Sequence, residues 1–199
     1  MDTQVITVNN EEITIPFYYE KIEPSPDVPE GSVVYMTQTE NAVCYLVVFA
    51  VDESGALPRE KDALINVVRS CLDDNQGIIK VESQEDYVYS IIKRLLDPSG
   101  VEYVCTYQKF YPEFVLTIQG FFREGDTTGI RDNTVFAMLR GEGLIGSEED
   151  PFDGWCQDPY DANITEGALM NASEEEEFDE MFPDFSLSLC RELIRTVIA

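Results

Sequence analysis

Hydrophobic and polar residues alternate over much of the first fifty residues, with the period of two that is typical of β-strands. The pair Asn9-Asn10 separates two such runs and predicts the polar turn of an opening hairpin. Pro24, Pro26 and Pro29 mark a loop after this hairpin. The last run is β-branched and aromatic enough to be a buried strand. The strands predicted in this region cover residues 5–8, 13–19, 32–37 and 42–51.

The hydrophobic spacing becomes helical after Pro58, which suits the first turn of a helix because it lacks an N–H group. The apolar face of this helix would hold Leu64, Ile65, Val68, Cys71 and Leu72. A short strand is expected at 78–81. A second helix would follow, capped by Ser83 or Asp86 and ended by the turn at 97–100. Its apolar face would consist of Val88, Ile91, Ile92 and Leu95.

Two strong strands, 101–110 and 114–122, alternate well enough to predict an antiparallel pair. A third helix is expected over the apolar residues Val135, Phe136, Met138 and Leu139. The chain ends in an amphipathic pattern that predicts a helix capped by Ser186. The apolar stripe of this terminal helix would consist of Leu187, Cys190, Leu193, Ile194, Val197 and Ile198.

This order of elements predicts an α+β fold in which helices pack on a mainly antiparallel sheet. We expect one domain over residues 1–199, with its α+β core in 1–140. Residues 141–185 would form a long acidic excursion, and the terminal helix, 186–199, would dock on the core. Because that helix ties the excursion down at its far end, we expect an ordered segment instead of a free tail.

Charge is distributed very unevenly along the chain. The formal net charge is −26, and residues 141–190 carry fifteen Asp and Glu residues but no Lys or Arg. A surface of this sign repels nucleic acid and anionic membranes and attracts cations or a basic protein. Crowded like charges also destabilise a fold, and the segment itself contains no cation to offset them. This favours a basic protein as the partner.

The residue types that most often carry chemistry are scarce. The chain has no histidine, and its five cysteines are widely spaced, as in a cytoplasmic protein with reduced, mostly buried thiols. Cys156 is expected to be exposed, with acidic neighbours that disfavour its thiolate. No secretory signal opens the sequence, and no apolar run is long enough to span a bilayer. We therefore expect a soluble, intracellular protein.

A glycine motif suggests a nucleotide site, but its context does not fit one. Gly141, Gly143 and Gly146 match Gly-x-Gly-x-x-Gly, yet a helix is expected before the motif and acidic residues follow it. A phosphate would be repelled there, so we interpret the motif as the exit from the third helix. Since the sequence also lacks the usual nucleophile and P-loop motifs, we expect a protein that is not an enzyme and needs no cofactor.

Two alternatives use the carboxylates themselves. The acidic segment could bind a divalent cation such as Ca²⁺ or Mn²⁺, although the EF-hand pattern fails in each register. In the register that begins at Asp161, Glu166 stands where glycine is required and Ala172 where the bidentate Glu is required. A carboxylate-based hydrolase would need two facing acids in a deep pocket. Neither alternative names a particular metal ligand or catalytic residue.

Aromatic residues interleaved with acids indicate a recognition surface, because Trp and Tyr often anchor interfaces while an acidic rim steers a basic partner. We predict that Trp155 and Tyr160 make buried contacts with the partner. The residues predicted to supply steering charge are Asp150, Asp153, Asp158, Asp161, Glu174, Glu175, Glu176 and Glu177. The alternative is that the aromatic residues pin a long loop onto the domain.

Several short motifs resemble those of a known group of proteins. They are Trp155-Cys-Gln-Asp-Pro-Tyr-Asp161, Leu169-Met-Asn-Ala-Ser-Glu174, Phe178-Asp-Glu-Met-Phe-Pro-Asp184 and Leu187-Ser188. Together they resemble the C-terminal half of small, uncharacterised proteins of Gram-positive gut and oral bacteria that are associated with polymorphic-toxin immunity. The resemblance implies an inhibitor that binds and blocks a toxin. The element order of residues 1–140 is similar to that of Mog1/PsbP-like α/β sandwiches.

Overall fold

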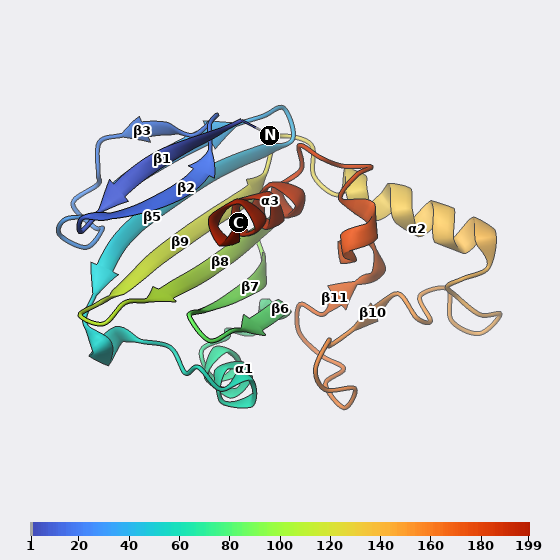
Figure 1. Ribbon diagram of the computed structural model, residues 1–199. Helices are drawn as coiled ribbons and strands as arrows, with labels where there is room; N and C mark the ends of the chain where they lie inside the picture. Colours follow the sequence, from blue (N-terminus) through green and yellow to red (C-terminus); the bar gives the residue numbers. More distant parts are fainter. Residues whose placement is uncertain (1) are drawn as a thin grey trace.

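A seven-stranded antiparallel sheet forms the centre of the computed structural model, which describes residues 2–199 (Figure 1). Its strand order is β3–β4–β5–β9–β8–β7–β6. These strands are β3 (Glu20–Ile22), β4 (Val33–Gln38), β5 (Ala42–Val51), β6 (Gln76–Ser83), β7 (Tyr87–Leu95), β8 (Val101–Phe110) and β9 (Val115–Glu124). With helices packed on this sheet, the fold class is α+β, as the sequence predicts.

One face of the sheet, here called the front face, is covered by two elements that lie toward the viewer in Figure 1. One is the hairpin of β1 (Thr3–Val8) and β2 (Glu11–Pro16), whose turn residues Asn9 and Asn10 both have positive φ. The other is the terminal helix α3 (Ser186–Ile198), which contacts β2, β5, β8 and β9. The predicted opening hairpin and the predicted docking of the terminal helix are both confirmed.

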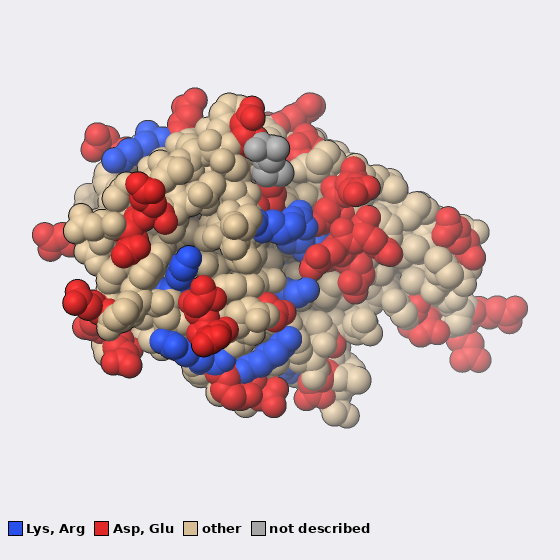
Figure 2. Space-filling view, in the orientation of Figure 1, with Lys and Arg blue, Asp and Glu red and all other residues tan. Residues whose placement is uncertain are grey.

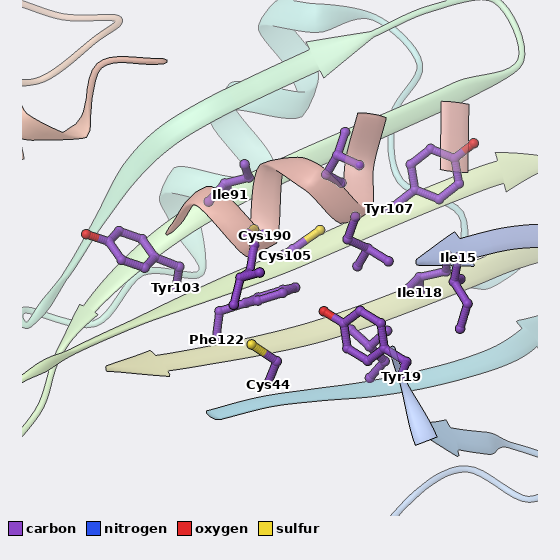
Figure 3. Packing of buried hydrophobic residues seen from close by; sticks show 14 of the residues in the cluster. Ile15, Tyr19, Cys44, Ile91, Tyr103, Cys105, Tyr107, Ile118, Phe122 and Cys190 are labelled. Atoms are coloured by element: carbon purple, nitrogen blue, oxygen red, sulfur yellow. The ribbon is translucent and has the colours of Figure 1, made fainter. Parts of the chain in front are cut away.

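The main hydrophobic core lies between these elements and the sheet. Cys190 of α3 meets Cys105 of β8, while Phe122 and Cys44 lie below them (Figure 3). Burial raises the pKa of the Cys44 thiol to about 12, so this core thiol stays protonated. All five cysteines are free, but Cys71 is exposed as well as Cys156, so burial is less general than the sequence suggests.

The opposite face, here called the back face, carries the helix α1 (Lys61–Ser70) at its β6 end. Leu64 and Val68 pack there against Ile78, Val81 and Val88. The predicted helix exists but begins later than Pro58, because the Glu60 carboxylate accepts hydrogen bonds from the backbone of Asp62 and Ala63 and caps the helix.

The helix α2 (Ile130–Glu142) lies beside the sheet and packs mainly on the acidic excursion (Figure 1). The excursion itself contains the short strands β10 (Cys156–Gln157) and β11 (Met170–Asn171) and the 3-10 turns η2 (Ala172–Glu174) and η3 (Glu176–Phe178). A third such turn, η1 (Glu53–Gly55), follows β5. A small apolar cluster of Val135, Phe178 and Phe182 joins α2 to the excursion.

The second predicted helix is wrong, since residues 87–95 form strand β7. Val88, Ile91, Ile92 and Leu95 do have helical spacing, but the strand buries residues on both of its faces. Ile91 enters the front core, whereas Val88 and Ile92 pack against α1. A strand buried on both sides leaves no two-residue alternation to recognise.

The predicted cap of the terminal helix also differs. Ser186 is the first residue of α3, and Phe185 occupies the cap position without a side-chain hydrogen bond. The helix is held by packing: Leu187, Leu193 and Ile194 are buried in the main core. None of the described helices is long and apolar enough to cross a membrane.

Candidate functional site

The second half of the acidic excursion, residues 170–180, turns part of its charge inward. Glu174 is 0% exposed. Its Oε2 accepts from Lys93 Nζ at 3.0 Å and from the backbone N–H of Asn171 at 2.7 Å, and its Oε1 accepts from the Tyr103 hydroxyl at 2.7 Å. Burial and the Glu174 carboxylate raise the pKa of Tyr103, so the phenol keeps the proton that it donates.

A second buried carboxylate, that of Asp179, forms ion pairs with three arginines. Its Oδ1 lies 2.9 Å from Arg191 Nη1 and 3.2 Å from Arg131 Nη2, and its Oδ2 lies 3.4 Å from Arg195 Nη1. Arg131 also donates to the carbonyls of Ser173 and Glu175, and Arg191 donates to the carbonyl of Glu174. These arginines from α2 and α3 therefore fix the backbone of 173–179 as well as its charge.

The prediction that Glu174 steers a partner from the surface is wrong, because its side chain is fully buried and hydrogen-bonded. Its three neighbours Glu175, Glu176 and Glu177 are exposed. Glu176 lies 2.9 Å from Lys80 Nζ, and this hydrogen bond holds the pKa of its carboxyl below the ordinary value. The glutamate run thus mixes one structural acid with three surface acids.

The first half of the excursion, residues 150–169, is tied to the sheet and to α1 by two polar side chains. Asp158 pairs with Arg69 of α1 at 2.9 Å and accepts from the backbone of Tyr160 and Asp161. The Tyr160 hydroxyl accepts from Val81 N at 2.7 Å and donates to Val81 O at 3.1 Å. Tyr160 thereby occupies the outer edge of strand β6, where a further strand would otherwise pair.

The remaining residues of the first half lie at the surface. Trp155 is half-buried and meets Phe136 of α2 edge-on at 5.0 Å, whereas Phe152 is 60% exposed. Asp150, Asp153 and Asp161 are exposed, and Asp150 and Asp161 accept hydrogen bonds within local turns. The hydrogen bonds that Asn163 donates to Asp161 lower the pKa of the Asp161 carboxyl, so this side chain is charged at neutral pH. Neighbouring residues of this half thus differ: some are packed or paired against the domain, and others lie free at the surface.

Three adjoining hollows, of about 440, 400 and 500 Å³, surround Ile164 in this half. Ile164 lines all three, Asp158 and Leu169 line the first two, and Arg69 lines the first and third. The second hollow is the most apolar, with Phe152 and Trp155 on its wall. Among the predicted residues, the structure brings Trp155, Asp158, Tyr160 and Asp161 to this place.

The hollows are strongly acidic. Their lining includes six carboxylates, those of Asp62, Asp73, Asp74, Asp158, Asp161 and Glu166. Arg69 is the one cation among the lining residues, and it is already paired with Asp158. In Figure 2 Lys and Arg side chains show only over the sheet-bearing left part, while acidic side chains continue to the far right.

Sequence reasoning missed four of these six acids. Asp62 belongs to the first turn of α1, and Asp73 and Asp74 follow shortly after the end of that helix. They join the site because the 158–169 loop folds back against α1 through the Arg69–Asp158 pair. No local sequence pattern predicts a contact between segments so far apart in the chain. Glu166 lies within the acidic excursion, so its charge alone could have placed it among the predicted site residues.

The glycine motif is confirmed as the exit from α2. Gly143 has a φ of 73° and caps the helix, donating its N–H to the carbonyls of Arg140 and Leu139. Gly146 has a φ of 77°, and a Cβ there would lie 2.8 Å from the Pro151 carbonyl oxygen, so this position favours glycine. Within residues 2–199, no three His, Cys, Asp or Glu side chains are grouped so as to hold a metal ion.

No protein-family model matches the chain, and no curated protein sequence is similar to it. Among solved structures it is similar to the Ran-binding protein Mog1p of Saccharomyces cerevisiae, with 8% sequence identity and a TM-score of 0.49. That alignment covers 98% of this chain and 94% of Mog1p. A point mutant of protein Mog1 gives 7% identity, a TM-score of 0.48 and coverages of 98% and 95%. The association with toxin immunity stays a prediction.

Proposed function

We propose that this protein is a non-enzymatic, cytoplasmic interaction module that binds a basic surface of another protein through the acidic hollows around Ile164. Its most concrete form is an immunity-type inhibitor that masks a basic toxin. The observation that carries the proposal is the lining of the hollows by six carboxylates against one cation that is already paired.

The charge of the hollows would act mainly on the approach of the partner. Complementary charge raises association rates and selects orientation, and its influence reaches about 8 Å at physiological salt. The apolar wall of Phe152, Trp155 and Ile164 would then supply contact area. A 60% exposed phenylalanine beside a half-buried tryptophan is the combination that interfaces use as anchors.

Neutralising part of the lining tests this proposal. The triple variant Asp74→Asn, Asp161→Asn, Glu166→Gln changes three exposed side chains of the hollows and keeps their shape. A matched control, Glu12→Gln, Asp27→Asn, Glu30→Gln, removes the same charge from exposed positions elsewhere. The probe is a fluorescent lysine-rich peptide with interspersed leucines. Its affinity is measured by titration, and its association rate is measured by stopped-flow mixing at low and high salt.

We expect the site triple to lower affinity at least about tenfold at low salt, and the control to change it less than about twofold. Raising the salt should slow association with the native protein. Equal loss in both triples would mean that only net charge attracts the peptide. An association rate that is indifferent to salt would contradict the electrostatic part of the proposal.

A further inference from the structure

An apolar stripe crosses the back face of the sheet and meets the acidic hollows only at its Ile78 end. Residues directly opposite in neighbouring antiparallel strands point to the same face, so the strand registers define the row. It runs over six strands through Met36, Tyr45, Phe121, Val104, Ile92 and Ile78. The Tyr45 and Phe121 rings are in contact, with centroids 6.4 Å apart.

Helix α1 covers only one end of this stripe. Ile78 and Ile92 pack with Leu64 and Val68 beneath the helix. Met36, Tyr45 and Phe121, on β4, β5 and β9, are each partly exposed. The main helix contacts of β5 and β9 are with α3, which lies on the front face. The two faces of the sheet therefore differ: the front face is covered by the hairpin and α3, whereas α1 covers only half of the back face.

A groove of about 160 Å³ follows the side of α1 that faces the open half. Val67, which is 36% exposed, and Cys71 form its wall on the α1 side. Ile92, Val104 and Thr106 form its floor on the sheet. Strands lie about 4.8 Å apart and a helix with its side chains is about 10 Å wide, so one more helix beside α1 would cover about two strands.

The charges at this face differ from those of the hollows. One row above the stripe, Arg123 lies between Val43 and Glu102, and Glu102 pairs with Arg94. Arg123 is exposed, and within residues 2–199 no carboxylate lies within ion-pair distance of it. In a chain with 13 cations and 39 acids, two arginines that share the single neighbouring carboxylate Glu102 beside an apolar stripe favour a further acidic group as their complement.

We propose that the open half of the back face binds an amphipathic helix of a partner protein, laid beside α1 with an acidic flank toward Arg123 and Arg94. Its apolar side would cover Tyr45, Phe121 and Val104, and its edge would meet Val67 of α1. The occupant is a helix because the groove already has one helical wall and a flat sheet floor. This site is separate from the acidic hollows and does not depend on their function.

Three synthetic helical peptides of about 14 residues test the proposal by fluorescence anisotropy. They share one apolar face and differ in having a glutamate flank, a lysine flank or a scrambled order. In the Asp74→Asn, Asp161→Asn, Glu166→Gln variant, whose hollows attract the lysine flank less, we expect the glutamate-flanked peptide to bind at least about tenfold more tightly than the other two. Equal binding of all three peptides, or no binding, would overturn the proposal.

Two variants locate the binding. Arg123→Glu should weaken the glutamate-flanked peptide at least about tenfold, while Lys21→Glu makes the same charge change on β3, opposite Tyr35 of the front core, and should leave it unchanged. Phe121→Thr should also weaken binding, provided that its thermal melt stays cooperative. If Phe121→Thr unfolds the protein, Arg123→Glu decides, because its side chain is exposed. Equal effects of the two charge reversals would refute the site.

Native cysteines supply an independent readout. A glutamate-flanked peptide carrying an exchangeable disulfide should cross-link to Cys71 in the groove in preference to Cys156, which is exposed on the excursion. Sedimentation of the protein alone examines a second copy as the occupant. Self-association that Phe121→Thr abolishes would mean that a second copy of the chain, and not a partner helix, covers this face. Cross-linking without preference between the two thiols would contradict the proposal.

Discussion

The two halves of the acidic excursion look alike in sequence and differ in structure. Residues 150–169 place Asp158, Asp161 and Glu166 in the lining of the hollows and leave Asp150 and Asp153 exposed elsewhere on the surface. Residues 170–180 bury Glu174 and Asp179 against Lys93 and three arginines. A run of like charge in a sequence therefore does not say whether a particular carboxylate serves recognition or stability.

The difference arises from where the neutralising cations come from. The excursion contains none, but Lys93 stands on β7, Arg131 on α2, and Arg191 and Arg195 on α3. These elements converge on the second half and leave most of the first half to solvent. The charges of Glu174, Glu176 and Asp179 are thus offset by cations from other parts of the chain, and the proposed basic partner would offset only the acids of the hollows.

The strongest way to break this comparison is to remove a buried acid. Glu174→Ala leaves Lys93 buried without a counter-charge and Tyr103 without its acceptor. We expect a loss of about 3–5 kcal/mol in the free energy of unfolding, because an uncompensated buried charge is costly. Urea unfolding measures it. Glu177→Ala, three residues on and exposed, should stay within about 0.5 kcal/mol of the native protein.

Equal losses in these two variants would contradict the division of the glutamate run. Replacing both buried partners sharpens the same point. Glu174→Leu combined with Lys93→Met should cost less than Glu174→Ala alone, since neither charge is then left unpaired. A double variant as unstable as the single one would mean that Glu174 acts mainly through its bonds to Asn171 and Tyr103.

A smaller effect is expected where the first half is pinned to the sheet. Tyr160→Phe removes the hydroxyl that bonds both polar groups of Val81 at the edge of β6. The free energy of unfolding should fall by about 1–3 kcal/mol. Hydrogen exchange should accelerate at the Val81 amide and not at amides of the central strand β9. Unchanged exchange at Val81 would show that the loop does not protect this edge.

The failure to predict β7 and the failure to predict the burial of Glu174 have one cause. The helix prediction uses only the spacing of Val88, Ile91, Ile92 and Leu95 and gives Lys93 no place in the core. In the structure the Lys93 side chain lies on the front side of the sheet and pairs with Glu174, a residue far away in the sequence. A buried ion pair hides two residues from hydrophobic patterning, because each member looks solvent-exposed on its own.

Patterns that depend on neighbours in sequence were more informative. The Asn9-Asn10 hairpin, the long strands β5, β8 and β9, and the glycine exit from α2 all follow from local alternation or backbone conformation. Trp155, Asp158, Tyr160 and Asp161 lie together at the hollows because they are close in the chain. Asp62, Asp73 and Asp74 join them only through tertiary contact.

The smallest predicted effect on stability concerns the exposed ion pair between Lys80 and Glu176. Hydrogen bonding to Lys80 lowers the pKa of Glu176 in the folded state, so the pair stabilises the fold above the ordinary pKa of 4.5 and loses this effect as the pH falls through the lowered value. Glu176→Gln should therefore cost less than about 1 kcal/mol at pH 7 and nothing at pH 2, measured by thermal unfolding. A difference that grows toward low pH would have the wrong sign.

Carboxyl footprinting tests the division of the excursion most directly. Brief carbodiimide coupling of the native protein to glycine ethyl ester, followed by peptide mass spectrometry, reports which acids are reachable. We expect rapid labelling of Asp150, Asp161, Glu166 and Glu177, and protection of Glu174 and Asp179 until the protein is unfolded. Labelling of Glu174 as fast as Glu177 in the folded protein would contradict the account.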